Sequence, residues 1–106
     1  MSAPQQSLLQ FNVEQTQCYL SGHLSQQAVV ELWPNVDNLL DNKVESLDLG
    51  GIESSDSAGV ALLLHLMALK RRTGVTLMMQ GAPSQLQKLI DLYDLQDFFA
   101  EEAKKG

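Results

Sequence analysis

The longest apolar run in this sequence covers residues 58–69, and His65 is the only residue within it that can carry a charge. These twelve residues are too few to cross a lipid bilayer, which requires about 20. A segment that is apolar on nearly every side is instead typical of a helix packed tightly onto a sheet. The pattern predicts a buried helix over residues 57–73, ended by Gly74.

Apolar and polar residues alternate over residues 9–14, near the start of the chain. Alternation over this length predicts a half-buried strand, and a second short strand over residues 18–22 follows closely enough to form an antiparallel hairpin. Ser25 then suits a helix N-cap, and apolar residues at helical spacing follow it. Because Pro34 interrupts that helix, we expect a kink or a split near Trp33.

A strand pattern also comes before the long helix. Residues 44–49 place Leu47 and Leu49 on one face, as expected of a strand that covers a core. Gly50-Gly51 breaks this pattern, so residues 52–55 are expected to form a loop that leads into the helix.

The remainder of the chain repeats the alternation of strand and helix. Residues 75–80 predict a strand with alternate apolar residues on one face. Pro83 suits the first turn of a third helix. Three apolar residues near the end of the chain predict a short final helix that closes the core: Leu95, Phe98 and Phe99.

The predicted elements follow the order β-β-α-β-α-β-α-α. Strands that are joined by helices run mostly parallel, because a crossover is needed to return in the same direction. The sequence therefore predicts an α/β fold, with a mostly parallel sheet and one antiparallel edge strand. At this length we expect a single domain over residues 1–106, with residues 1–6 disordered.

Composition restricts the partners and the compartment. The formal net charge is −6, which disfavours nucleic acid and anionic lipid as direct partners because both require a basic face. The basic cluster Lys70-Arg71-Arg72 lies where helix 57–73 would end, and there it complements the helix dipole. Cys18 is the only cysteine, so no intramolecular disulfide is possible, and we expect it to fill the core. Since no targeting segment is visible, we expect a cytoplasmic protein that does not insert into a membrane.

Catalysis is not expected from this sequence. His23 and His65 are the only histidines, and Cys, His and carboxylate residues do not cluster with the spacing of a metal site. Neither a phosphate-binding GxxxxGK[ST] loop nor a nucleophile elbow occurs. We therefore expect a binding protein with no catalytic residue, no metal and no cofactor.

The most informative segment reads Asp56-Ser57-Ala58-Gly59, at the start of the long helix. The first turn of a helix has free backbone N–H groups, which can receive an anion or another acceptor from a partner. Ser57 alternatively serves as the N-cap and satisfies one of these groups itself. We expect a partner-binding surface centred on Ser57, with five neighbouring residues at its rim: Ser54, Ser55, Asp56, Ala58 and Gly59.

The succession of a strand, a polar loop, Asp-Ser/Thr-x-Gly and a leucine-rich helix resembles the STAS domain family, which is found in sulfate transporters and anti-sigma-factor antagonists. Leu47-Asp48-Leu49 matches the central strand of that family, and Ser21-Gly22-His23-Leu24 stands where the family often has Gly-Glu-Leu-Asp. Within the family, the chain most resembles the small cytoplasmic STAS subunits of ABC transporters that move phospholipid between bacterial membranes. Three segments carry this resemblance: Leu32-Trp33, residues 59–66 and Leu92-Tyr93-Asp94-Leu95. The resemblance covers nearly the whole chain.

This resemblance implies a STAS fold and a binding role. In the transporter subunits, the position of Ser57 lies on the surface that binds the ATPase of the transporter. The implied partners are therefore that ATPase subunit and, through it, a membrane permease. Such a subunit would be peripheral to the inner membrane and would support the lipid asymmetry of the outer membrane.

An alternative within the same family is an anti-sigma-factor antagonist that a partner kinase switches by phosphorylating Ser57. A phosphate would add about −1.5 to −2 charge beside Asp56. The helix dipole would favour this charge and the Asp56 carboxylate would oppose it, so the sequence leaves the alternative open. His23 and Ser25 replace the acidic pair of the Gly-Glu-Leu-Asp loop, which argues against the kinase contacts of the antagonists.

Overall fold

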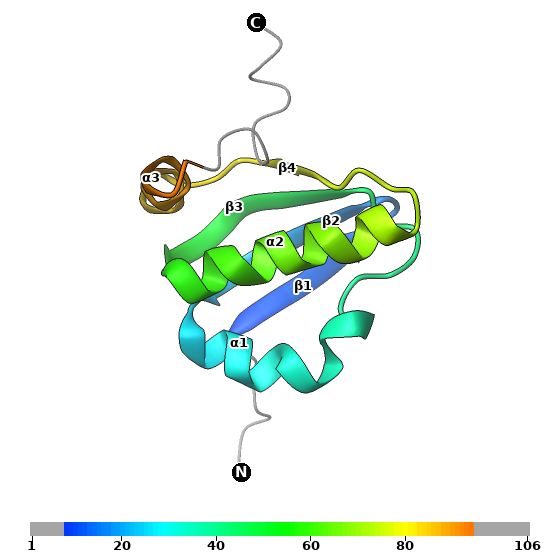
Figure 1. Cartoon of the computed structure of the whole chain (residues 1–106), viewed down its shortest axis with the longest axis horizontal. Helices are drawn as coiled ribbons and strands as arrows, with labels where there is room; N and C mark the ends of the chain where they lie inside the picture. Colours follow the sequence, from blue (N-terminus) through cyan, green and yellow to red (C-terminus); the bar gives the residue numbers. More distant parts are fainter. Residues whose placement is uncertain (1–7, 95–106) are drawn as a thin grey trace, which may run out of the picture.

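Four strands form one mixed sheet in the order β1-β2-β3-β4, in a computed structural model that describes residues 8–94 (Figure 1). β1 (Leu9–Glu14) and β2 (Gln17–Leu24) make the antiparallel hairpin that the alternation predicts. β3 (Ser46–Ser55) pairs with β2 and β4 (Met78–Gln80) pairs with β3, both in parallel. The predicted fold class, with one antiparallel strand at the edge of a mostly parallel sheet, is confirmed.

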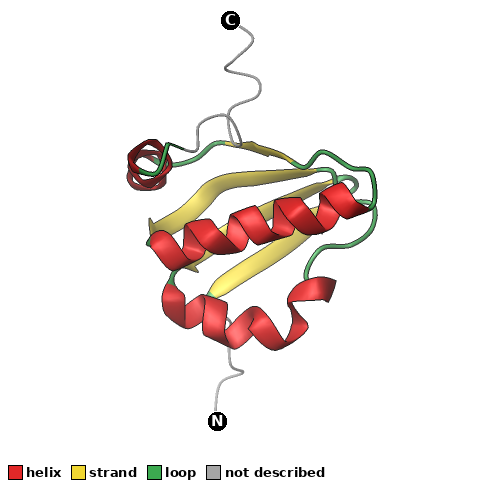
Figure 2. Cartoon of the chain, viewed as in Figure 1, coloured by secondary structure: helices red, strands yellow, loops and turns green. Residues whose placement is uncertain are grey.

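The helices follow the predicted order as far as the structure describes the chain. α2 (Ser57–Arg72) lies lengthwise over the sheet, with α1 (Gln26–Leu32) beside it on the side of β1 (Figure 2). α3 (Ser84–Leu92) lies near the opposite edge, at β4. The predicted final helix around Leu95 and the predicted disorder of residues 1–6 lie outside the described residues.

The first helical segment divides where Pro34 predicts it. The Ser25 side chain accepts a hydrogen bond from the N–H of Ala28, as an N-cap does. After Leu32 the chain tightens into the 3-10 helix η1 (Trp33–Asn38), in which Asn35 leaves helical geometry (φ −115°, ψ 21°). A proline lacks an N–H and clashes with the preceding turn, so the α-helix does not continue through it.

The predicted loop over residues 52–55 is wrong, because β3 continues through both glycines to Ser55. The register shifts twice along the β2–β3 ladder, at Ser21 opposite Gly51 and at His23 opposite Ser54. A Cβ at Gly51 would lie 2.8 Å from the carbonyl oxygen of Leu20. Gly51 therefore permits a close approach of β2 at an irregular point of the strand, and does not end the strand.

The predicted strand over residues 75–80 is only partly correct, because β4 has three residues. The N–H of Val75 donates to the carbonyl oxygen of Lys70 (3.0 Å), and that of Gly74 donates to Arg71 (2.9 Å). With φ +85° at Gly74, these two bonds close the C-terminus of α2 in a Schellman motif. Val75 therefore belongs to the end of the helix, and pairing with β3 begins only at Met78.

The core lies between the sheet and the helices that cover it. Cys18 is fully buried in β2, as predicted. Within residues 8–94, no helix combines the length and the apolar character that spanning a membrane would require. The buried side chains of α2 come from two adjacent stripes of the helix: Val60, Leu62, Leu63, Leu66, Met67 and Lys70.

Candidate partner-binding site

The Asp56 side chain joins the starts of two helices. Its Oδ1 accepts a hydrogen bond from the N–H of Gly59 in the first turn of α2 (3.0 Å). Its Oδ2 accepts a second hydrogen bond from the N–H of Gln26, the first residue of α1 (3.0 Å). The N–H of Asp56 in turn donates to the carbonyl oxygen of Leu24 at the end of β2 (3.1 Å). Asp56 thus ties β2, α1 and α2 together at one point.

Ser57 is not the N-cap of α2, because Asp56 has that role. Asp and Ser are about equally good caps, so the choice between adjacent residues depends on the surrounding structure. Asp56 has two carboxylate oxygens, so one accepts from the N–H of Gln26 while the other caps α2. Ser57 is left as the first residue of the helix, with an exposed side chain.

Gly59 lies inside the molecule, against the end of β2. A Cβ at this position would overlap the carbonyl oxygen of Leu24 and would lie 2.7 Å from its carbonyl carbon. Only glycine lets the first turn of α2 approach β2 so closely. Gly59 therefore fixes where Ser57 and Ala58 stand, although its own surface is buried.

Ser54 and Ser55 are the last residues of β3 and are both partly buried. The Oγ of Ser54 lies 2.7 Å from Nδ1 of the exposed His23 on β2. The N–H of Ser55 donates to Oε1 of Gln85 in α3 (3.0 Å), and its Oγ is buried without a hydrogen-bond partner. Both serines directly precede Asp56 at the start of α2, where the sequence predicts the rim of the binding surface, and their contacts run to β2 and α3.

An open apolar groove of about 600 Å³ lies between α1 and α2. Val30 is 66% exposed and Trp33 is 48% exposed, which is unusual for large apolar side chains on adjacent turns. The groove reaches Ala58, so it extends to the residue that follows the exposed Ser57 in the first turn of α2. Seven residues line it: Val29, Val30, Trp33, Pro34, Ala58, Ala61 and Leu62.

The sequence pattern did not identify this groove. The apolar residues at helical spacing after Ser25 predict the buried face of the first helix, and this stripe includes Val29, Leu32, Trp33 and Val36. About half of the Trp33 surface is nevertheless exposed. Val30 falls outside that stripe, and an apolar residue on the polar side of an amphipathic helix was the available signal. The groove arises because α1 and α2 meet at their starts and leave these side chains uncovered.

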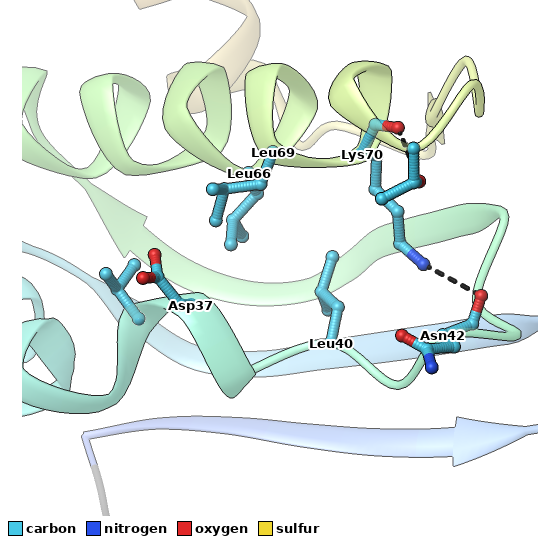
Figure 3. A pocket seen from close by; sticks show the side chains of 8 residues that line it. Asp37, Leu40, Asn42, Leu66, Leu69 and Lys70 are labelled. Atoms are coloured by element: carbon cyan, nitrogen blue, oxygen red, sulfur yellow. Dashed lines mark hydrogen bonds between the residues drawn. The ribbon is translucent and has the colours of Figure 1, made fainter.

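A second, smaller pocket of about 80 Å³ lies near the other end of α2 (Figure 3). There Lys70 is 7% exposed, and its Nζ donates to the carbonyl oxygens of Asp41 (2.9 Å) and Asn42 (3.2 Å). The sequence assigned the basic cluster only an interaction with the helix dipole, whereas Lys70 also makes these two hydrogen bonds. It holds the loop before β3 against α2.

The described residues contain no group of three or more His, Cys, Asp or Glu side chains that could hold a metal ion. The hydrogen bond between His23 and Ser54 joins two neighbouring strands at the protein surface. The geometry around Ser57 thus offers an exposed hydroxyl, a helix start and an apolar groove, which are features of a binding surface.

The chain also matches a known protein family. The family profile described as "Mlab, STAS domain" matches residues 7–100, which is most of the chain.

The chain belongs to the STAS domain family.

Two curated relatives carry the name intermembrane phospholipid transport system binding protein MlaB. The Escherichia coli (strain K12) protein is 33% identical over 76 residues, which cover 72% of this chain and 77% of that protein. The Haemophilus influenzae protein is 28% identical over 97 residues, which cover 87% of this chain and 92% of that protein. These matches confirm the resemblance to MlaB-type STAS domains.

Solved structures confirm the STAS fold. The unphosphorylated anti-sigma factor antagonist SpoIIAA superposes with a TM-score of 0.65 and 18% identity, over 90% of this chain and 91% of that one. Bacillus SpoIIAA in its phosphorylated form gives a TM-score of 0.59 at 18% identity, over 90% and 95%. At this identity the likeness concerns the fold alone.

Proposed function

We propose that this STAS domain is a non-catalytic subunit of an ABC transporter for phospholipid and that it binds the ATPase of that transporter. Its relatives are named as binding proteins of an intermembrane phospholipid transport system. The main structural support is the groove between α1 and α2, which exposes Val30 and Trp33 and extends to Ala58, the residue after Ser57. Exposed aromatic and aliphatic anchors in a concave surface are typical of protein–protein contacts.

In this proposal the side chains of Ser57, Ala58 and the groove contact the ATPase. Ser54, Ser55 and Asp56 lie at the rim, and Gly59 holds the first turn of α2 in position. The net charge of −6 suits a protein partner with basic residues and disfavours direct contact with anionic lipid headgroups. Association with the membrane would then occur through the ATPase and its permease, from the cytoplasmic side.

The test measures the affinity of the purified chain for the ATPase subunit encoded in the same genome, with and without the permease. Ser57→Glu adds a charge and bulk to the proposed contact and should raise Kd at least about tenfold. Ser84→Glu is the matched control, because Ser84 is the exposed first residue of α3 and carries the same change away from the groove.

Equal binding by wild type, Ser57→Glu and Ser84→Glu would refute this placement of the contact. Failure of the wild-type chain to bind either the ATPase or its complex with the permease would refute the proposed function itself. Both variants should unfold at the temperature of the wild type, because both positions are exposed.

A phosphorylation switch is the second candidate, and the exposure of Ser57 at the start of α2 favours it. A phosphate on Ser57 would be stabilised by the dipole of α2 and repelled by the Asp56 carboxylate. Both oxygens of that carboxylate already accept hydrogen bonds from backbone N–H groups. Intact-mass analysis of the chain from its native cells distinguishes the candidates. Stoichiometric phosphoserine at Ser57 supports the switch, whereas unmodified chain bound to the ATPase supports the transporter subunit.

A further inference from the structure

The two walls of the groove come from different helices, and one side chain links them. Val29, Val30 and Trp33 are contributed by α1 and the start of η1, and Ala58 and Ala61 by α2. The relative position of the two helices therefore determines the width of the groove.

α1 has seven residues, too few for an isolated helix to be stable in water. Its start must be held by tertiary contacts. The hydrogen bond from the N–H of Gln26 to Oδ2 of Asp56 provides such a contact, while Oδ1 of the same carboxylate caps α2 through Gly59. Bonds between a carboxylate and a backbone N–H are stronger than bonds between neutral groups. A single carboxylate thus connects the starts of the two helices that form the walls of the groove.

We propose that Asp56 is a positioning residue, which sets the spacing of the groove walls and acts on partner affinity through α1. This refines the role of Asp56 within the proposed function and rests on it for the identity of the partner. Both of its oxygens are engaged within the chain, so its effect reaches the partner through Val30 and Trp33.

Two substitutions separate positioning from direct contact. In Asp56→Asn, the amide oxygen still caps α2, because Asn is as good a cap as Asp, but the NH₂ group opposes the N–H of Gln26. Gln26→Pro removes the donor of the same hydrogen bond, because proline has no backbone N–H. Proline is favoured at the first position of a helix, and the preceding Ser25 is extended (φ −125°, ψ 170°), as a residue before proline should be.

The first readout needs no partner. Trp33 is the only tryptophan, and its ring lies 4.9 Å from that of His65 on α2, so its emission reports on the position of α1 relative to α2. Asp56→Asn should change the emission spectrum, and Gln26→Pro/Asp56→Asn should match Gln26→Pro alone. An Asp56→Asn spectrum identical to that of the wild type would overturn the proposal.

The second readout is the affinity for the ATPase subunit. Asp56→Asn should weaken binding by about tenfold in the wild-type background and by less than about twofold in the Gln26→Pro background, since the linked donor is then absent. An equal loss in both backgrounds would mean that Asp56 contacts the partner directly, and would overturn the positioning role.

If the wild-type chain does not bind the ATPase, the proposed function fails, and the Trp33 spectra still decide the role of Asp56. If Asp56→Asn does not fold, Gln26→Pro alone must shift the Trp33 emission for the proposal to stand.

Discussion

The centre of the Trp33 ring system lies 4.9 Å from the centre of the His65 ring, with 42° between the two ring planes. This contact joins the start of η1 to the middle of α2, and one ring nitrogen of His65, Nε2, is buried there without a hydrogen-bond partner. The indole therefore packs against α2 while about half of its surface is exposed at the groove. A rigid, half-exposed aromatic ring needs little ordering when a partner binds.

Trp33→Ala should therefore weaken binding to the ATPase by about 30-fold or more, the loss of about 2 kcal/mol that defines an interface hot spot. Tyr19→Ala is the matched control, because Tyr19 is a similarly exposed aromatic residue (39%). It lies on β2, on the opposite face of the sheet from its buried neighbours Cys18 and Leu20. Titration calorimetry measures both. A Trp33→Ala variant that binds as well as Tyr19→Ala would remove the groove from the proposed contact.

Gly59→Ala should destabilise the fold by about 1–3 kcal/mol or more, because the added Cβ overlaps the backbone of Leu24. Ser57→Ala, two residues earlier on the same helix and exposed, should stay within about 0.5 kcal/mol of the wild type. Urea unfolding followed by circular dichroism gives both values. Equal stability of the two variants would show that α2 can move away from β2 at no cost.

Lys70→Met should cost about 1–3 kcal/mol, because the carbonyl oxygens of Asp41 and Asn42 lose a charged donor. The methionine keeps most of the apolar stem, so the loss reports mainly on the hydrogen bonds. Lys88→Met, at an exposed position of α3, should leave the free energy of unfolding almost unchanged. An equal change in the free energy of unfolding for Lys70→Met and Lys88→Met would contradict a stabilising role of the Lys70 hydrogen bonds.

Burial raises the pKa of the Cys18 thiol above its ordinary value of 9.0, and a backbone hydrogen bond with Asn12 partly opposes the shift. The folded protein then keeps the thiol proton at a pH where the unfolded chain loses it. The contribution of Cys18 to stability is therefore fully present below the pKa of the unfolded chain and decreases as the pH rises above it. The free energy of unfolding should fall more steeply between about pH 8 and 10 in the wild type than in Cys18→Ala. Parallel pH profiles would contradict a buried thiol.

The fold class was predictable because each element carries its own local pattern. Alternation over residues 9–14 predicts β1, the apolar run predicts α2, and Pro34 predicts the division after Leu32. The parallel sheet follows from the helices between the strands. These inferences need only neighbouring residues and elementary geometry, and the structure confirms them.

The errors occur where a distant residue changes a local preference. Gly51 continues β3 because Leu20 of the neighbouring strand approaches it there. Val75 leaves the predicted strand because its N–H closes the end of α2. Asp56 caps α2 in place of Ser57 because a donor thirty positions earlier in the sequence, the N–H of Gln26, engages its second oxygen.

The sequence by itself determined the order of the elements within residues 8–94, the burial of α2 against the sheet and the location of Ser57 at a helix start, since periodicity and capping preferences act over a few residues. Tertiary structure alone decided that Val30 and Trp33 form an open groove beside Ser57 and that Asp56 links its two walls. Exposure and helix spacing depend on how segments remote in sequence pack together, and no local pattern encodes that packing.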